Sequence, residues 1–131
     1  MFTQIKTTLA NKAVVTELTS KFMLGTENVI ARIAIAYSLH SGKHFSPLDV
    51  RGSGGKEYSR NVLFGQRFPF YLAMICTYYN IKENDMNIPR YFKMHLDDGL
   101  EMIYADIKDN PNLVGYGYLF DRIEEGIKDL N

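Results

Sequence analysis

The chain has 131 residues, of which 46% are hydrophobic and 23% are charged, and its formal net charge is zero. This composition predicts a single globular domain over residues 1–131 and excludes an intrinsically disordered chain. No apolar run approaches the roughly 20 residues of a membrane span, and the first residues lack the apolar core of a signal peptide. The single cysteine excludes an internal disulfide framework. We therefore expect a cytoplasmic protein.

Charge is divided unevenly along the chain. Residues 1–67 contain nine basic and four acidic residues, a formal charge of +5, whereas residues 68–131 contain six basic and eleven acidic residues, a formal charge of −5. Such an asymmetry is typical of a basic binding surface beside an acidic flank. It is equally typical of two halves that attract each other, or of subunits that dock in opposite orientations.

Residues 9–24 are predicted to form the first helix. Val14, Leu18 and Phe22 fall near one face at helical spacing. Gly25 is placed to end this helix as the residue after its C-cap. Because another helix follows at once, the two should pack as an antiparallel or angled hairpin.

Residues 25–39 (GTENVIARIAIAYSL) predict a buried central helix. Thr26 is a suitable N-cap, and the residues after Asn28 are apolar on nearly every side, interrupted only by Arg32 and Ser38. Such a helix is expected to lie in the core or to be covered by a partner subunit. Arg32 needs a carboxylate, a carbonyl or a phosphate there, and we expect a structural ion pair.

The next segment is rich in chain-breaking residues. Residues 41–57 contain Pro47 and four glycines, which predict a loop, and Gly42 should end the second helix. In residues 58–64, larger side chains alternate with smaller ones, which is compatible with a short strand or an extended arm.

Three further helices complete the predicted fold. Residues 67–80 have apolar side chains at spacings of three and four, Pro89 suits the first turn of a fourth helix, and a last helix should follow Pro111. The acids of residues 97–109 are expected to form a solvated face or a docking surface for the basic half. The fold class is therefore all-α, with about five helices, a glycine-rich loop and one short extended segment. The inward stripes are Leu96, Leu100, Ile103 and Ile107 in the fourth helix, and Leu119, Phe120, Ile123, Ile127 and Leu130 in the last.

The glycine-rich stretch RGSGGKEY is similar to a phosphate-binding loop but lacks its spacing. A P-loop has a glycine five residues before the glycine that precedes the lysine, and Ser or Thr after that lysine; here Val50 and Glu57 occupy these positions. An ATP site is therefore not expected. Two interpretations remain: the loop amides could approach an anion with charge from Arg51, Lys56 and Arg60, or the loop could be flexible with solvated cations.

A metal site is weakly indicated. His95 could share a helix face with Asp98, and Asp97 lies nearby, but a metal ion needs three or four convergent ligands. His40 and His44 are four residues apart but straddle the end of the second helix. If ligands did converge at His95, the chain could be a metal-dependent hydrolase or nuclease; the competing interpretation places His95 on a helix surface.

Other reactive or aromatic side chains have structural explanations. Cys76 is expected to be a small buried hydrophobe. Tyr71, Tyr78 and Tyr79 recur at helical spacing, which is more typical of core or interface positions than of a base-stacking platform. No arrangement of serine, cysteine and histidine suggests a nucleophile, so we expect neither an enzyme nor a bound cofactor or metal.

Three blocks, GTENVIARIAIAYSL, GGKEYSRNVLFG and KMHLDDGLEMI, in this order and at these distances, resemble the DNA sulfur modification protein DndE family over most of residues 9–105. The resemblance implies a small, all-α, tetrameric, DNA-binding protein of a bacterial DNA phosphorothioation system, in which sulfur replaces a non-bridging phosphate oxygen. The resemblance also implies that the protein acts together with a cysteine desulfurase, a sulfurtransferase-like subunit and an SMC-like ATPase, and that it does not itself transfer sulfur. A lysine near the end of the family's first helix is linked to DNA binding, and Lys21 is the nearest match.

We therefore expect a non-catalytic DNA-binding subunit that assembles as a homotetramer. Lys12, Lys21, Lys56 and Arg60 would contact DNA phosphates, with a nicked duplex among the candidate forms, and would not read bases. The alternative is an assembly adaptor that bridges the ATPase and sulfurtransferase subunits through the acidic C-terminal half, with little DNA binding of its own.

Overall fold

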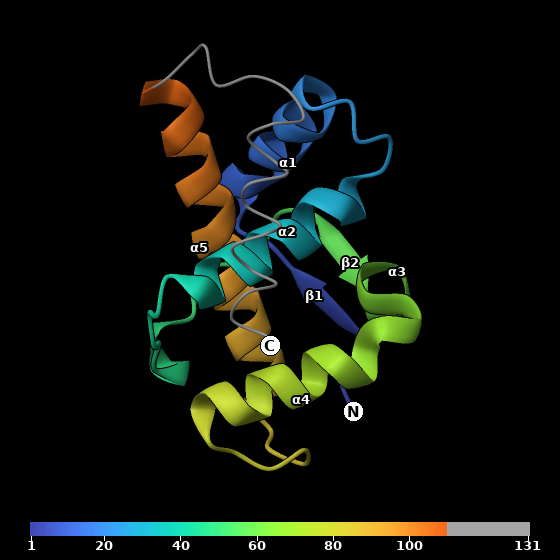
Figure 1. Cartoon of the computed structure of the whole chain (residues 1–131), viewed down its shortest axis with the longest axis vertical. Helices are drawn as coiled ribbons and strands as arrows, with labels where there is room; N and C mark the ends of the chain where they lie inside the picture. Colours follow the sequence, from blue (N-terminus) through green and yellow to red (C-terminus); the bar gives the residue numbers. More distant parts are fainter. Residues whose placement is uncertain (110–131) are drawn as a thin grey trace.

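The centre of the fold is the crossing of helices α2 (Glu27–His40) and α5 (Ile88–Asp109), which make the most extensive contact in a computed structural model that describes residues 1–109 (Figure 1). Ile30, Ala34 and Ile35 of α2 are completely buried. The prediction of a buried central helix is therefore confirmed. The apolar stripe predicted in α5 is buried as well: Leu96, Leu100, Ile103 and Ile107.

The two central helices approach very closely at Gly99 of α5. A β-carbon built on Gly99 would lie 1.9 Å from the carbonyl oxygen of Ala34. Only glycine fits there unless the helix backbones move apart. Gly99 thus sets how closely α2 and α5 cross, a role that its local sequence does not reveal.

Helix α1 (Leu9–Lys21) packs across α2 and α5 but ends earlier than predicted. Its C-cap is Phe22, and Met23 takes the left-handed conformation with φ of 54°. The amides of Met23 and Leu24 bond back to carbonyl oxygens of the last helical turn, as in a Schellman motif. The assignment of Gly25 as the residue after the C-cap was therefore wrong; Gly25 supplies a second positive φ, of 80°, later in the turn.

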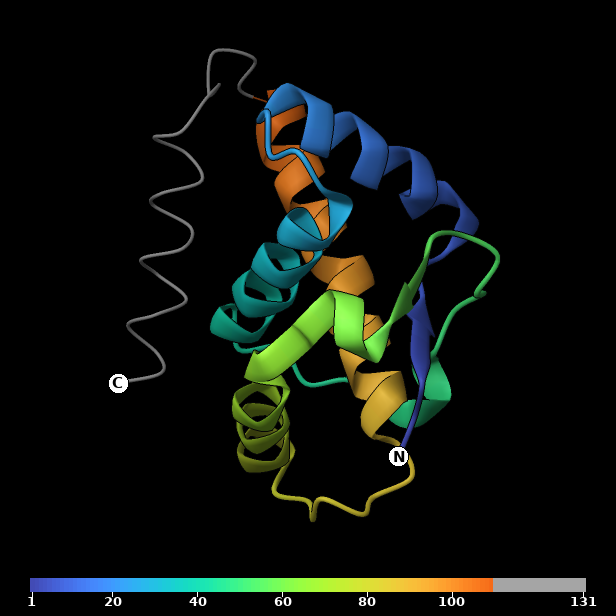
Figure 2. The same ribbon diagram turned by 90° about the vertical axis from the view of Figure 1, so that its right-hand side faces the viewer.

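A small antiparallel sheet lies beside the helices (Figure 2). Strand β1 (Gln4–Lys6) pairs with β2 (Glu57–Ser59), with Ile5 opposite Tyr58. Both of these side chains are buried, so the sheet closes one side of the core. Strand β1 was not predicted.

The segment predicted as a strand or arm is extended only at its start. Residues 60–64 form helix α3 (Arg60–Phe64), because the Ser59 hydroxyl accepts the Val62 amide at 3.1 Å and caps the helix. The prediction for residues 58–64 was therefore correct for the first two residues and wrong for the rest.

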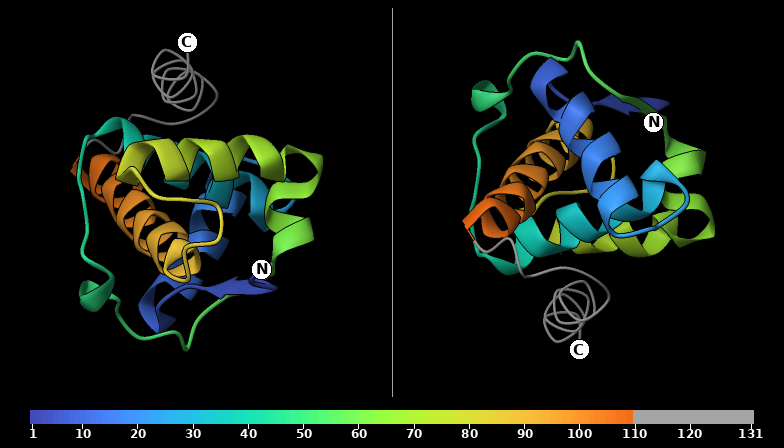
Figure 3. Two further views of the ribbon diagram at one scale, coloured as in Figure 1. Left: turned by 90° about the horizontal axis from the view of Figure 1, so that it is seen from below. Right: turned by 90° about the horizontal axis from the view of Figure 1, so that it is seen from above.

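The remaining elements follow the predicted order. Residues 41–56 form the expected loop, with one 3₁₀ turn at Pro47–Asp49, and a second 3₁₀ turn, Gly65–Arg67, leads into α4 (Phe68–Tyr79). Viewed from below, α4 lies against the start of α5 (Figure 3). The mainly helical fold class is confirmed, and no described helix is long and apolar enough to cross a membrane. The last predicted helix lies outside the described residues.

Candidate nucleic-acid interface

Among the described residues, two salt bridges join the basic half of the chain to the acidic half. Lys43 pairs with Asp98 at 3.0 Å, and the Arg51 guanidinium holds both carboxylate oxygens of Glu101. These pairs join residues of the basic half to α5. The interpretation that the two halves attract each other is therefore confirmed, and part of the acidic face of α5 is a docking surface for the first half.

Beneath the Arg51–Glu101 pair lies a buried ion pair. Lys93 and Asp97, at side-chain exposures of 7% and 1%, are 2.9 Å apart. The Lys93 ammonium also donates to the Lys6 and Gly52 carbonyl oxygens, so all three of its protons are used. Asn11 donates to Asp97 at 2.8 Å. This network ties α5, α1, β1 and the glycine-rich loop together.

The same network affects the acidity of Glu101. Burial alone would raise the pKa of this carboxyl, but hydrogen bonds from Arg51 and Asn11 outweigh burial and hold the pKa below its usual value. The Glu101 carboxylate is therefore charged and committed to its partners.

The glycine-rich loop packs against the protein and is not an open anion cradle. A β-carbon on Gly55 would lie 2.0 Å from the Thr8 carbonyl oxygen, so this glycine serves packing. The amides of Gly55 and Lys56 donate to the Thr7 carbonyl and hydroxyl oxygens at 3.0 and 2.9 Å. The Gly55 and Lys56 amides and the Arg51 guanidinium are therefore already used within the fold, which disfavours the anion-binding interpretation.

Lys12 and Lys21 occupy two margins of the exposed face of α1. Both side chains are exposed, and no carboxylate among residues 1–109 pairs with either. Nine residues separate them, which is two and a half helical turns and about 13 Å along the axis, so they flank the exposed face on opposite sides. Small side chains, including Ala13 and Ser20, lie between them, while Glu17 lies one turn before Lys21 on the same side.

Lys56 and Arg60 lie at the two ends of β2 and both contact protein groups. Lys56 is 3.8 Å from the Glu27 carboxylate, which also accepts the hydroxyl of Thr16 in α1. Arg60 donates to the Phe2 carbonyl oxygen at 3.3 Å, and its guanidinium carbon lies 5.0 Å from the centroid of the Phe68 ring. Because Lys12 lies one turn before Thr16, the fold brings Lys12 and Lys56 to the same side of α1; Arg60 and Lys21 lie elsewhere.

The predicted partner of Arg32 is replaced by another acceptor. Its guanidinium donates to the Leu63 carbonyl oxygen at 2.9 Å, and within residues 1–109 it forms no ion pair. The expected structural ion pair was wrong, although a carbonyl was among the acceptors considered. This bond fastens α3 to α2.

His95 is completely buried, so its assignment to a helix surface was wrong. Its Nδ1 lies 2.8 Å from the Ser38 hydroxyl, and its Nε2 lies 2.6 Å from the Tyr79 hydroxyl. The Ser38 hydroxyl donates its one proton to Asp98, so Nδ1 of His95 carries a proton. Burial lowers the pKa of the imidazole to about 4, against a smaller opposing effect of Asp98, so the ring is neutral near pH 7 and its Nε2 accepts from Tyr79.

This polar cluster lacks the geometry of a nucleophile or metal site. The Ser38 hydroxyl donates to Asp98 rather than to the histidine, and Ser38 is completely buried. No group of three or more His, Cys, Asp or Glu residues in the described part of the chain could hold a metal ion. The weaker alternative, in which His95 would bind a metal ion with Asp97 and Asp98, therefore finds no support among the described residues.

Cys76 and the tyrosines of α4 are where the sequence analysis expected them. Cys76 is buried, and burial raises the pKa of its thiol, with smaller contributions from Glu83 and Asp85. Tyr79 stacks on Tyr91 with ring centroids 3.9 Å apart. These side chains serve packing.

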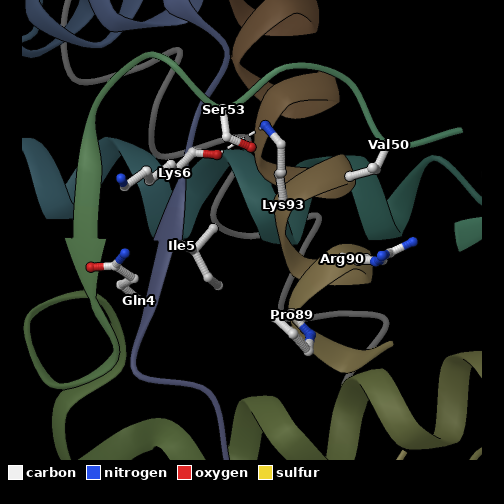
Figure 4. A pocket seen from close by; sticks show the side chains of 8 residues that line it. All are labelled: Gln4, Ile5, Lys6, Val50, Ser53, Pro89, Arg90 and Lys93. Carbon is white, nitrogen blue, oxygen red and sulfur yellow. Dashed lines mark hydrogen bonds between the residues drawn. The ribbon is translucent and has the colours of Figure 1, made fainter. Parts of the chain in front are cut away.

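One open site was not anticipated from the sequence. A groove of about 380 Å³ lies between β1, the start of α5 and the loop before β2, and Lys6 and Arg90 are on its rim (Figure 4). The pairing of Lys93 with Asp97, four residues apart on α5, was visible in the sequence. The burial of the Lys93–Asp97 pair depends on strand β1, and the three residues of β1 show no sequence pattern that predicts a strand.

Comparison with known proteins identifies the family of this chain. The family model described as DNA sulphur modification protein DndE matches residues 4–110, which is most of the chain. A comparison with curated proteins gave no match. The matched region contains the α2–α5 crossing, the buried polar networks and all four predicted DNA-contacting residues. The chain belongs to the DndE family of DNA sulfur modification proteins.

Proposed function

We propose that this protein is a non-catalytic DNA-binding subunit of a DNA sulfur modification complex and that it contacts the phosphate backbone through α1. The observation that carries the proposal is the presence of two exposed lysines, Lys12 and Lys21, without carboxylate partners in the described chain. By contrast, Lys43, Arg51 and Lys93 are all neutralised within the fold.

The shape of α1 suits a phosphate contact. Lys12 and Lys21 lie about 13 Å apart along the helix axis, on the two margins of the exposed face, so together they could contact separate phosphates of the DNA backbone. Small side chains between them would allow the helix to approach closely. Lys56 would add a weaker contact because Glu27 is nearby, and Arg60 would add one through its remaining guanidinium donors.

A non-catalytic role is supported by the chemistry of the single cysteine. Sulfur transfer through a cysteine uses an accessible thiolate with a depressed pKa. Cys76 is buried, and its pKa is raised. The sulfur chemistry would then belong to the sulfurtransferase-like partner, with the ATPase subunit and this protein positioning DNA.

A homotetramer is consistent with the uncharged face of α4. No charged residue occurs in Phe68–Tyr79, and the side chains of Phe70 and, in α3, Val62 are about half exposed. Exposed apolar surface of this kind is typical of a subunit interface.

Light scattering of the purified protein with intact, nicked and single-stranded 30-mer DNA tests these proposals together. A tetramer mass alone, and a larger complex with at least one of the DNA forms, is expected. Absence of a complex with every form would leave the adaptor role and remove the DNA-binding proposal.

A further inference from the structure

Two side chains of α2 bind the carbonyl groups at the end of α3, and one of them keeps donors to spare. Asn28 and Arg32 lie one turn apart on α2 and donate to the Val62 and Leu63 carbonyl oxygens at 3.1 and 2.9 Å. A guanidinium has five N–H donors, so this bond leaves most of those of Arg32 available. The bond also holds the partly buried Arg32 side chain in place.

Arg67 and Tyr71 bring two further donors to the same corner of the fold. They are four residues apart where the second 3₁₀ turn runs into α4 with helical backbone angles, so their side chains share one face. The Tyr71 ring packs on Phe64, the residue after Leu63, with ring centroids 4.9 Å apart. Burial raises the pKa of the Tyr71 phenol, and the charges of Arg32 and Arg67 partly offset this increase. The three side chains thus meet between α2, α3 and α4.

No acidic side chain within residues 1–109 neutralises this corner. Neither Arg32 nor Arg67 forms an ion pair there, and no described group bonds the Tyr71 hydroxyl. Residues 58–82 contain no aspartate or glutamate. Glu27 of α2 lies about 140° around the helix from Arg32, and its carboxylate faces a different lysine. The corner therefore combines two uncompensated positive charges with an unused hydroxyl.

We propose that Arg32, Arg67 and Tyr71 form a binding site for a single phosphate group. Their donors come from α2, from the 3₁₀ turn and from α4, and a tetrahedral oxyanion has enough oxygens to accept from all three. The two positive charges match the charge of a phosphate dianion. A carboxylate fits less well, because one guanidinium satisfies both of its oxygens and the second arginine would remain without a partner.

The site is largely formed before the ligand arrives. The Leu63 carbonyl holds Arg32, and packing on Phe64 holds Tyr71, so only the exposed Arg67 side chain has to be ordered on binding. The site lies outside α1 and does not depend on the DNA contact proposed for that helix. A DNA backbone phosphate and a free phosphate present the same oxygens to it, so the experiment has to separate these two sources.

The first test follows the Tyr71 hydroxyl directly. Protein with carbon-13-labelled tyrosine is titrated with sodium phosphate, and separately with sodium chloride at the same ionic strength and pH. The NMR signal of Tyr71 Cζ, identified by its loss in Tyr71→Phe, should move saturably with phosphate and not with chloride. No saturable movement with phosphate, or an equal movement with chloride, would overturn the proposal.

Variants that each remove one donor assign the contacts by calorimetric titration with inorganic phosphate. Arg67→Gln should weaken phosphate binding about tenfold, and Tyr71→Phe about fivefold. Both should keep the wild-type melting temperature, because no described group bonds either of the polar groups removed. Arg90→Gln removes an exposed arginine of α5 and is the matched control, with unchanged phosphate affinity. Wild-type affinity in both Arg67→Gln and Tyr71→Phe would contradict the site.

A 30-mer duplex without terminal phosphates separates the two sources of the phosphate. If the DNA backbone supplies it, the duplex moves the Tyr71 signal and competes with inorganic phosphate; if a small phosphate compound supplies it, the duplex does neither. Both results keep the site and name its ligand. Lys21→Glu should leave inorganic phosphate affinity unchanged even where it weakens duplex binding. Loss of inorganic phosphate binding in Lys21→Glu would place the anion at α1 and refute the proposal.

Discussion

Acidification is expected to destabilise this protein through His95. The imidazole is neutral and fully buried, with Nε2 accepting from Tyr79 and Nδ1 donating to Ser38. A proton added to Nε2 would prevent it from accepting the Tyr79 hydroxyl proton and would place a charge in the core. The unfolded chain has no such restriction and binds this proton at the ordinary histidine pKa of about 6.5.

The sign and size follow from the two pKa values. The folded state has a pKa of about 4, so between about pH 6.5 and 4 the unfolded state binds more protons, and stability falls as pH falls. The contribution of His95 is fully present above pH 6.5. Between pH 7.5 and pH 5.0 the loss from this one group is about 2 kcal/mol.

The assay is urea denaturation at pH 7.5 and pH 5.0 for the wild type and for His95→Gln. The variant will be less stable at both pH values, but its stability should change by about 2 kcal/mol less between them. His40 and His44 are present in both proteins, so the comparison isolates the contribution of His95. Equal pH dependence of the two proteins would refute the assignment of a buried neutral imidazole at position 95.

Three further stability measurements test the packing. Gly99→Ala should cost about 3 kcal/mol or more in urea denaturation, because its β-carbon would overlap the Ala34 carbonyl; an unchanged midpoint would disprove this close crossing. Asp97→Ala should lower the free energy of unfolding by about 3–5 kcal/mol, because it leaves the buried Lys93 charge unpaired. Glu101→Gln breaks the half-exposed pair with Arg51 and should lower it by about 1 kcal/mol. Equal losses in the two variants would contradict the difference in burial between the two pairs. Met23→Gly should raise the melting temperature by a few degrees, because Met23 is 77% exposed and has a positive φ; a lower melting temperature would show that the side chain contributes to packing.

The helices were predictable because their signals are local. Apolar spacing and the breaks at Gly42, Pro47 and Pro89 are read within a few residues of each position, and helices α1, α2, α4 and α5 follow them, whereas α3 does not. The end of α1 was misplaced because Met23, a residue that rarely adopts positive φ, takes the position that glycine usually fills.

Features that depend on distant partners were not predictable from one sequence. The burial of His95 depends on Ser38, 57 residues away, and a local pattern cannot show that partner. Strand β1 has three residues and exists through its pairing with residues 57–59. The candidate site was predictable only in part. The exposure of Lys12 and Lys21 follows from their positions on the polar face of α1. The pairing of Lys56 with Glu27 joins residues that are distant in the sequence, so a local pattern cannot show it.

The salt dependence of DNA affinity is the most direct test of whether the exposed face of α1 contacts DNA phosphates. Affinity for a 30-mer duplex is measured from 50 to 300 mM salt for the wild type, Lys21→Glu and Lys82→Glu. Lys82 is an exposed lysine in the segment between α4 and α5 and is the matched control. This segment lies at the opposite end of the fold from α1 (Figure 1). The account predicts that Lys21→Glu lowers affinity and flattens the slope of log affinity against log salt by about 1, while Lys82→Glu leaves the slope unchanged. Equal slopes for all three proteins would contradict it.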